Sequence, residues 1–142
     1  MLKPALLALA SAMPNGRIGI QLRIRLLRMA GMKLGPSMVI IGPFTVLPQR
    51  AARKISIGRK SYLGARCRFG GRAGVTIGEF AQIAPDVSFD TATHTLAFEA
   101  GKARPTIQHP IAIEGHVWIG TARAFWEALQ LAGARWLLLA QW

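Results

Sequence analysis

The residues best suited to proton-transfer chemistry in this chain are its three histidines, His94, His109 and His116. A neutral imidazole accepts a proton near pH 7, which makes histidine a frequent general base in enzymes. Three imidazoles are also a ligand set that suits zinc. Asp86 and Asp90 precede His94 and are candidates to orient it or to bind substrate hydroxyls, and each is equally consistent with an exposed carboxylate at a bend. Taken alone, the residues around His94 favour an exposed side chain at a corner over a catalytic base.

The second chemical feature is positive charge. The formal net charge is +12, from 18 Lys and Arg against 6 Asp and Glu, and the pI is about 11.7. This charge predicts attraction to anions, for which coenzyme A phosphates, anionic lipids, acidic polysaccharides and nucleic acids are candidates. The cations of the central segment are expected on the surface, as a solvated face or as a track for a polyanion. They are Arg53, Lys54, Arg59, Lys60, Arg66, Arg68 and Arg72. No helical module for reading nucleic acid is visible in the sequence, so specific nucleic-acid recognition is not expected.

A period of six indicates the elements that must position these residues. Large apolar residues recur in two runs of three, glycine follows most of them, and a small residue stands four positions after each. The large residues are Ile57, Leu63, Phe69, Ile77, Ile83 and Phe89, and the small ones are Ser61, Cys67, Ala73, Ala81, Val87 and Thr93. Periods of six are typical of a β-helix, a coil of short parallel strands with three hexapeptides in each triangular turn.

This fold gives each repeated position an expected place. The large residues should fill the interior, and the small ones should point inward near the corners. Glycine should permit a backbone conformation that a Cβ disfavours. Cys67 occupies a small inward position, so we expect it in the core and not as a nucleophile, and a single cysteine excludes an intramolecular disulfide. At 142 residues the chain is expected to be one domain.

From about residue 31 to residue 120 the chain resembles the hexapeptide-repeat acyltransferase family, and within it the sugar and polysaccharide O-acetyltransferases. Residues 85–94 are similar to the family segment that ends in its catalytic histidine, and residues 110–120 to the coil that resumes after its projecting loop. The resemblance implies an all-β fold, a left-handed parallel β-helix over residues 32–120, with a loop at 95–109. In the family this loop reaches toward a neighbouring subunit, which implies a homotrimer.

The resemblance also assigns chemistry to individual residues. The family's histidine at the position of His94 is a general base that takes the proton from a sugar hydroxyl as its oxygen attacks an acetyl thioester. Acetyl-CoA is thus implied as co-substrate, and no covalent enzyme intermediate is needed. Trp118 matches a tryptophan beside the acceptor pocket across a subunit boundary, although a tryptophan buried by trimer packing explains it nearly as well. Arg104, in the loop, is a candidate contact for the acceptor or a coenzyme phosphate. The expected function is acetyl transfer to a sugar or polysaccharide hydroxyl.

The chain departs from the family's pattern at two places. Gly64 and Arg66 stand where relatives often carry acceptor-binding asparagines, so the acceptor class is open. In the family the pantetheine arm of the coenzyme binds along coils beyond the position of Gly120. A chain without those coils keeps the histidine base but lacks the groove that binds acetyl-CoA. Two alternatives therefore remain. One is a metal enzyme similar to γ-class carbonic anhydrases, although His109 and His116 lack that family's paired spacing. The other is a non-enzymatic basic protein that binds membranes or polyanions.

The N-terminal segment, residues 1–31, predicts a capping helix. Residues 17–30 have helical periodicity, with Arg17, Gln21, Arg25 and Arg28 on one stripe. We expect this helix to cover the open end of the coil, and a basic amphipathic helix at a membrane surface is an alternative that is compatible with it. No apolar run is long enough to span a bilayer. The expected location is the cytoplasm, with possible peripheral contact at the inner membrane face.

Residues 121–142 predict a tail without the repeat. Apolar residues at four-three spacing, among them Phe125, favour a helix that covers the end of the coil. Back-translation supports a second hypothesis. In a shifted reading frame, each new codon consists of the last base of one codon and the first two bases of the next. Codons permitted by the tail sequence can then encode further hexapeptide repeats with glycine. The tail would then be the product of a frameshift near residues 121–123, which the gene sequence would test.

Overall fold

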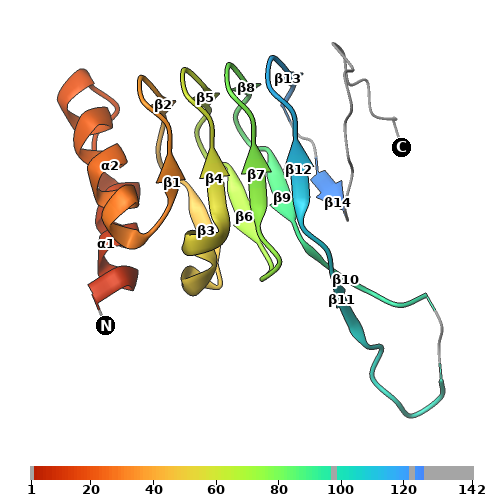
Figure 1. The fold of residues 1–142 in the computed structure, drawn as a ribbon. Helices are drawn as coiled ribbons and strands as arrows, with labels where there is room; N and C mark the ends of the chain where they lie inside the picture. The colour runs from red at the N-terminus through yellow and green to blue at the C-terminus, as the bar shows by residue number, and fades with distance from the viewer. Residues whose placement is uncertain (1, 97–98, 122–123, 127–142) are drawn as a thin grey trace.

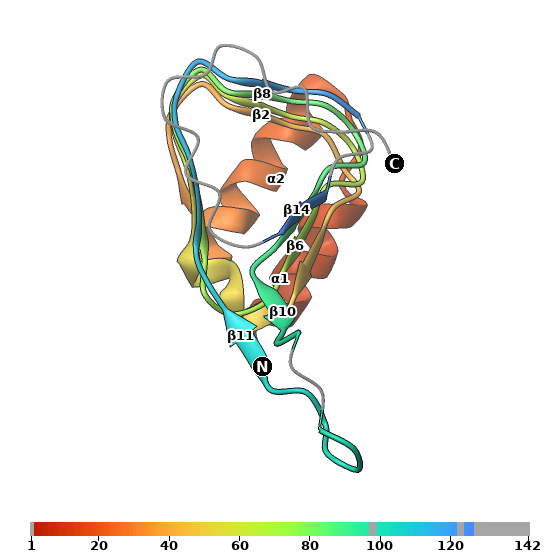
Figure 2. The same cartoon turned by 90° about the vertical axis from the view of Figure 1, so that its right-hand side faces the viewer.

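The chain folds as a coil of short parallel strands that two helices close at one end (Figure 1). The computed structural model describes residues 2–96, 99–121 and 124–126, the last three as backbone alone. The strands form three four-stranded parallel sheets, and the coil has a triangular cross-section when viewed along its axis (Figure 2). The parallel, all-β coil that the period of six predicts is confirmed.

Each turn of the coil contributes one strand to each sheet. The first sheet contains β1 (Lys33–Leu34), β4 (Ile55–Ile57), β7 (Val75–Ile77) and β12 (Ile111–Ile113). The second contains β2 (Val39–Ile40), β5 (Tyr62–Leu63), β8 (Gln82–Ile83) and β13 (Trp118–Ile119). The third contains β3 (Thr45–Leu47), β6 (Arg68–Gly70), β9 (Ser88–Asp90) and β14 (Ala124–Trp126). Outside the coil, β10 (Ala92–His94) and β11 (Thr106–Gln108) pair antiparallel in a hairpin.

The large apolar residues of the repeat fill the interior, as predicted. Leu63 lies in register with Ile83 of the next turn, and the rings of Phe69 and Phe89 stack with centroids 5.1 Å apart. All six of these repeated residues are buried. Each turn places an apolar residue at the same inward position as the turn before it. The core is therefore stabilised mainly by contacts between neighbouring turns.

Most of the small positions are also buried. Side chains with almost no exposed surface are those of Ser61, Cys67, Ala81 and Val87. Ala73 and Thr93 are only half-buried, because both lie where the chain leaves the regular coil. Burial raises the pKa of the Cys67 thiol to about 11, so the thiol stays protonated near neutral pH. A buried thiol in this state is a poor nucleophile, in agreement with its expected place in the core.

The glycines that follow the inward residues serve a purpose different from the predicted one. Gly58, Gly64 and Gly78 do not have positive φ values, so their backbone conformation is open to other residues. A Cβ at any of them would collide with the backbone of the next turn. Glycine is therefore needed because stacked turns approach too closely for a side chain. The left-handed corner conformation falls on non-glycine residues three positions after the inward ones, among them Arg66 and Asp86.

Replacing Gly64 by alanine should lower the free energy of unfolding by about 2–3 kcal/mol, since the new methyl group would overlap the backbone at Pro85. Gly16→Ala is the matched control, because a Cβ there meets no atom within 4 Å. Urea unfolding followed by circular dichroism measures both changes. Equal stability of the two variants would contradict this explanation of the glycines.

The two helices cap the first turn of the coil (Figure 1). α2 (Arg17–Ala30) has the predicted bounds, and Gly31 ends it with a φ of 110°. Its buried residues, among them Leu27, belong to the core of the coil, so the helix caps the open end as expected. α1 (Leu2–Ala12) packs against α2. No helix in the described residues has the length and apolar character of a membrane span.

Arg23 on α2 connects both helices to the coil. Its side chain is 0% exposed, and its Nε and Nη1 donate hydrogen bonds to the carbonyls of Ala10 (2.9 Å) and Ile40 (2.7 Å). Nη2 donates to the carbonyl of Met13. Burial lowers the pKa of this guanidinium because it disfavours the charged form. The sequence periodicity did not single out this residue.

β14 extends the third sheet beyond the point where the repeat ends. Its residues pair in parallel with β9, with Phe125 opposite Phe89. A helix that includes Phe125 is therefore wrong for residues 124–126. The domain division at residue 121 stays a prediction. Parallel pairing uses backbone groups, so it does not require the glycine pattern. The remainder of the predicted tail helix falls on residues 127–142, outside the described part of the chain. The frameshift near residues 121–123 stays a hypothesis, and residues 122–123 are likewise outside the described part.

Candidate functional site

The candidate site lies at the corner between the third and the first sheet. Three successive connections from the third sheet to the first stack there, as the register of the sheets requires. They are the 3₁₀-helix η1 (Gln49–Lys54), the turn of residues 71–74, and the segment that contains β10 and β11. The hairpin projects away from the coil at this corner (Figures 1 and 2). The loop expected at 95–109 is thus the outer part of a longer projection that starts at β10.

Thr91 anchors the base of the hairpin. This residue is 1% exposed, and its Oγ1 donates a hydrogen bond to the Gly70 carbonyl (3.0 Å) and accepts one from the Ala73 amide (3.3 Å). Its carbonyl accepts a bond from the amide of His109 on the returning strand (3.0 Å). Both arms of the hairpin are therefore fixed to the coil through one residue.

Substituting Thr91 by valine should lower the free energy of unfolding by about 1–3 kcal/mol. The isosteric side chain leaves the Ala73 amide without its acceptor and removes one of the two hydrogen bonds that Thr91 donates to the Gly70 carbonyl. Thr93→Val is the control. Thr93 is half-buried on β10, and its side chain has no hydrogen-bond partner among the described residues. Chemical denaturation measures stability, and hydrogen exchange of β10 and β11 amides reports whether the hairpin opens locally. If both valine variants match the parent in the two measurements, Thr91 is not the anchor.

Asp90 shapes the turn into the hairpin. Its Oδ1 accepts a hydrogen bond from the amide of Ala92 at 3.1 Å, a local contact typical of aspartate at turns. Asp90 therefore acts on the backbone that leads to His94. That Asp90 orients His94 stays a prediction, and a contact with acceptor hydroxyls remains a proposal.

His94 ends β10 with an exposed side chain. Its Nδ1 lies 3.2 Å from the carbonyl oxygen of Arg104 on the other side of the hairpin loop. A carbonyl only accepts hydrogen bonds, so Nδ1 is the nitrogen that carries the proton. In the neutral ring Nε2 then has a free lone pair and is the basic nitrogen. The hairpin thus holds an exposed imidazole in which Nε2 is the nitrogen able to accept a proton.

Arg104 acts on His94 through its backbone. Its side chain lines a cavity of about 280 Å³ inside the hairpin loop, together with Thr95, Lys102 and Pro105. Lys102 is neutralised there by an ion pair with Glu99 (2.6 Å). The cavity adjoins the residue after His94, so it is a candidate space for part of a substrate.

Asp86 and Trp118 lie away from this corner within one chain. Asp86 sits between the second and third sheets, where both carboxylate oxygens accept hydrogen bonds from Arg66 at 2.6 and 2.7 Å. This pairing lowers the pKa of Asp86. Trp118 is on β13 in the second sheet, opposite the corner of His94, and is 52% exposed. Neither residue contacts His94 in one chain, although the sequence places Asp86 only eight residues before it.

The three histidines do not form a metal site in one chain. His116 lies at the corner between the first and second sheets, where its ring stacks on Phe80 at 4.9 Å. No group of three or more His, Cys, Asp or Glu side chains able to hold a metal occurs among the described residues. The donor set therefore does not fit the zinc alternative within one chain.

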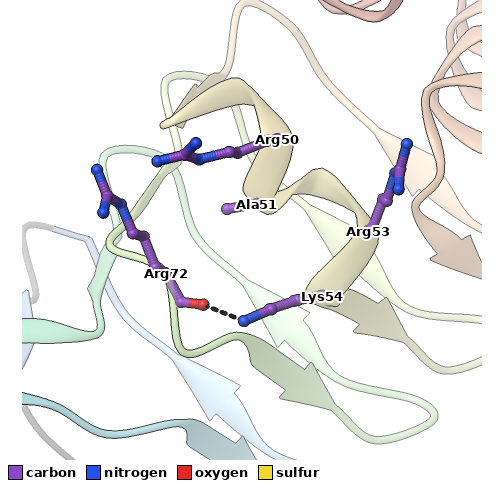
Figure 3. Close-up of a pocket in the computed structure, with 5 residues that line it drawn as sticks. All are labelled: Arg50, Ala51, Arg53, Lys54 and Arg72. Carbon is purple, nitrogen blue, oxygen red and sulfur yellow. Dashed lines mark hydrogen bonds between the residues drawn. The ribbon is translucent and has the colours of Figure 1, made fainter.

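Two groups can be distinguished among the cations of the central segment. Arg59 and Arg66 are paired with carboxylates of the next turn, Glu79 and Asp86, with nitrogen–oxygen distances of 2.6 Å. The second group gathers at the corner of the hairpin, where four cationic side chains line one cavity (Figure 3). They are Arg50, Arg53, Lys54 and Arg72. Three of these residues, Arg53, Lys54 and Arg72, belong to the cations that the sequence predicts on the surface. The sequence alone does not distinguish them from the arginines that form ion pairs.

Comparisons with known proteins agree with this fold. No protein-family profile matches the chain. The Schizosaccharomyces pombe protein named "Putative acetyltransferase C18B11.09c" is 36% identical over 66 residues, which cover 46% of this chain and 32% of that protein. The hexapeptide-repeat-containing acetyltransferase VCA0836 of Vibrio cholerae O1 biovar eltor, solved with acetyl-coenzyme A, superposes with a TM-score of 0.73 and 25% identity. The match covers 89% of this chain and 65% of that one.

A galactoside acetyltransferase solved with coenzyme A shares the fold at a TM-score of 0.74 and 22% identity, over 88% of this chain and 60% of that structure. The chain thus spans about a third of the curated relative and less than two thirds of these two structures. The described part of the chain has the fold of the hexapeptide-repeat acetyltransferases.

Proposed function

We propose that this chain is an acyltransferase that moves an acetyl group from acetyl-CoA to a hydroxyl of a sugar or polysaccharide. Nε2 of His94 takes the hydroxyl proton while the hydroxyl oxygen attacks the carbonyl carbon of the thioester. The carbon–sulfur bond then breaks and the coenzyme leaves as a thiolate. The proton on His94 passes to the coenzyme sulfur, which forms the free thiol of coenzyme A. Both substrates are bound together, so proximity supplies much of the rate.

The observation that carries this proposal is the state of His94. Its Nδ1 donates to the Arg104 carbonyl, which leaves a basic nitrogen exposed beside a cavity on a projecting hairpin. The structure of the Vibrio cholerae acetyltransferase in complex with acetyl-coenzyme A, at 25% identity, supports acetyl-CoA as the donor. The sugar acceptor is supported by the sequence resemblance at residues 85–94, since the galactoside enzyme shares only the fold.

A homotrimer would complete this site. Trp118 lies on the sheet opposite His94, so a contact of both residues with one acceptor requires two copies of the chain. The exposed indole is suited to a surface that another copy covers. Light scattering with mass determination tests the proposed assembly, and a monomer at working concentrations would contradict it.

The test of the function is acetyl-CoA turnover by this chain with a panel of neutral and acidic sugars, followed by release of free thiol. We expect release that depends on both the acceptor and the enzyme concentration, together with acetylated acceptor in the mass spectrum. Absence of turnover with every acceptor, combined with no measurable binding of acetyl-CoA, would overturn the proposal.

A second candidate function, contact with an anionic membrane, is favoured by the outer face of the cap. Exposed apolar side chains gather on α1 and α2 next to Arg17 and Arg25, including Leu2, Leu9, Ile18, Leu22 and Met29. Apolar residues beside cations suit the surface of an acidic bilayer. The proposed location is then the cytoplasm, at the inner face of the membrane. Flotation with vesicles of phosphatidylglycerol and phosphatidylcholine tests this contact, and equal flotation of Ile18→Ser/Leu22→Ser would contradict it.

A further inference from the structure

The cavity at the hairpin corner has an unusual lining. Its volume is about 400 Å³, and Arg50, Arg53, Lys54 and Arg72, here called the cationic corner, surround it with Ala51. The guanidinium groups of Arg50 and Arg72 extend to the same side of η1, while Arg53 extends to the other side (Figure 3). The four charges thus flank η1 instead of converging on one point.

Most of these charges have no partner among the residues that the structure describes. Lys54 Nζ donates a hydrogen bond to the carbonyl of Arg72 at 2.8 Å, but a carbonyl carries no net charge. The guanidinium groups of Arg50, Arg53 and Arg72 make no hydrogen bond or ion pair with any described residue. Arg59 and Arg66, by contrast, are each paired with a carboxylate. Four like charges around one cavity repel one another, and a bound anion would remove that repulsion.

The sequence provides no acidic residue to neutralise the cationic corner locally. Every Asp and Glu of the chain lies at or after Glu79. A second cavity, of about 560 Å³, shares Arg50 and Arg53 with the first and adds Lys3 of α1. The positive surface therefore continues from the corner toward the helical cap, which makes it longer than a site for one small anion.

The cationic corner is joined directly to the hairpin that carries His94. The backbone amide of Arg72 donates to Oε1 of Gln108 on β11 at 2.7 Å, and Gln108 pairs with Ala92 on β10. Adjacent strands lie about 5 Å apart, and two residues of strand add about 7 Å. With the Gln108 side chain included, the backbone of Arg72 is thus on the order of 10–15 Å from His94, within reach of a short oligosaccharide.

We propose that the cationic corner binds the carboxylate, sulfate or phosphate groups of an acidic saccharide chain and directs one of its hydroxyls to His94. This inference rests on the proposed acetyl transfer and names its acceptor class. An extended row of cations fits charges that repeat along a polymer. The cavity has no aromatic lining on which a nucleobase could stack, so a nucleic acid fits less well.

The test measures binding of fluorescein-labelled oligogalacturonate, a carboxylated probe, by fluorescence anisotropy without acetyl-CoA. Removing both charges in Arg50→Gln/Arg72→Gln should raise Kd at least about tenfold, because charge-assisted hydrogen bonds are lost. Arg25→Gln/Lys33→Gln removes the same charge from exposed residues outside the cationic corner and should change Kd less than about twofold. A neutral probe, labelled maltoheptaose, should bind weakly to all three proteins.

Two results would overturn the proposal. One is an equal loss of oligogalacturonate binding in both double variants, which would indicate attraction to net charge alone. The other is displacement of the probe from the cationic corner by coenzyme A, which would assign the corner to the coenzyme phosphates. Because binding is measured without acetyl-CoA, a chain that binds the probe as expected but shows no thiol release would contradict the proposed acetyl transfer and leave the binding site standing.

Discussion

Replacing His94 by alanine is expected to lower kcat/KM for acetyl transfer by about 10²- to 10⁴-fold, the usual contribution of a general base. The variant loses the imidazole that the Arg104 carbonyl holds in position at the end of β10. The exposed location of His94 makes a large effect on folding unexpected, because surface substitutions rarely change stability by more than about 0.5 kcal/mol. Initial rates of thiol release at saturating acetyl-CoA measure the change.

The control for His94 is a second exposed histidine at a different corner. His116 has a left-handed backbone (φ 61°), which asparagine tolerates, so His116→Asn should keep both fold and turnover. Coenzyme and acceptor affinities of the His94 variant should stay close to those of the parent, since the loss belongs to the transition state. Unchanged turnover in His94→Ala would remove this residue as the base and with it the central element of the proposed function.

The largest expected effect on stability belongs to Arg23. Arg23→Met keeps much of the side-chain volume but removes the donors to the carbonyls of Ala10, Met13 and Ile40. These carbonyls come from α1, from the residue after it and from β2, so no single local movement satisfies all three. Loss of these hydrogen bonds should lower the free energy of unfolding by about 3–5 kcal/mol and weaken the packing of the two helices on the first turn.

Arg25→Met on the same helix is the control for Arg23, because Arg25 is exposed and the change in charge and size is the same. It should alter the free energy of unfolding by less than about 0.5 kcal/mol. Urea denaturation gives the difference, and hydrogen exchange of α2 amides separates loss of the cap from loss of the coil. Equal midpoints for the two variants would show that the buried hydrogen bonds of Arg23 contribute little net stability.

The coil itself could be predicted from the sequence. Residues such as Leu63 and Ile83 recur at a fixed distance because each turn of a β-helix presents the same environment to the same position. The bounds of α2 could also be predicted, since its periodicity and the following glycine are local signals. The position of His94 was visible as the point where the period of six stops, which is where the chain must leave the coil.

Only the tertiary structure decided which neighbours these residues have. Asp86 is close to His94 in sequence, yet it lies at another corner and pairs with Arg66, because a triangular coil turns to a new face every six residues. The need for glycine after the inward residues depends on the distance between stacked turns, which the sequence of a single repeat does not reveal.

Arg23 and the cationic corner both depend on contacts that could not be predicted from the sequence. The sequence by itself determined that the chain is strongly basic and that its cations stand outside the inward columns. It could not determine that Arg23 would be buried against three carbonyls, that Arg59 would find Glu79, or that Arg50 and Arg72 would share one cavity. Those outcomes depend on segments that are 10 or more residues apart in sequence and meet only when the helices and turns pack together. The period of six thus fixes which side of the coil a residue faces, and stacking decides what it meets there.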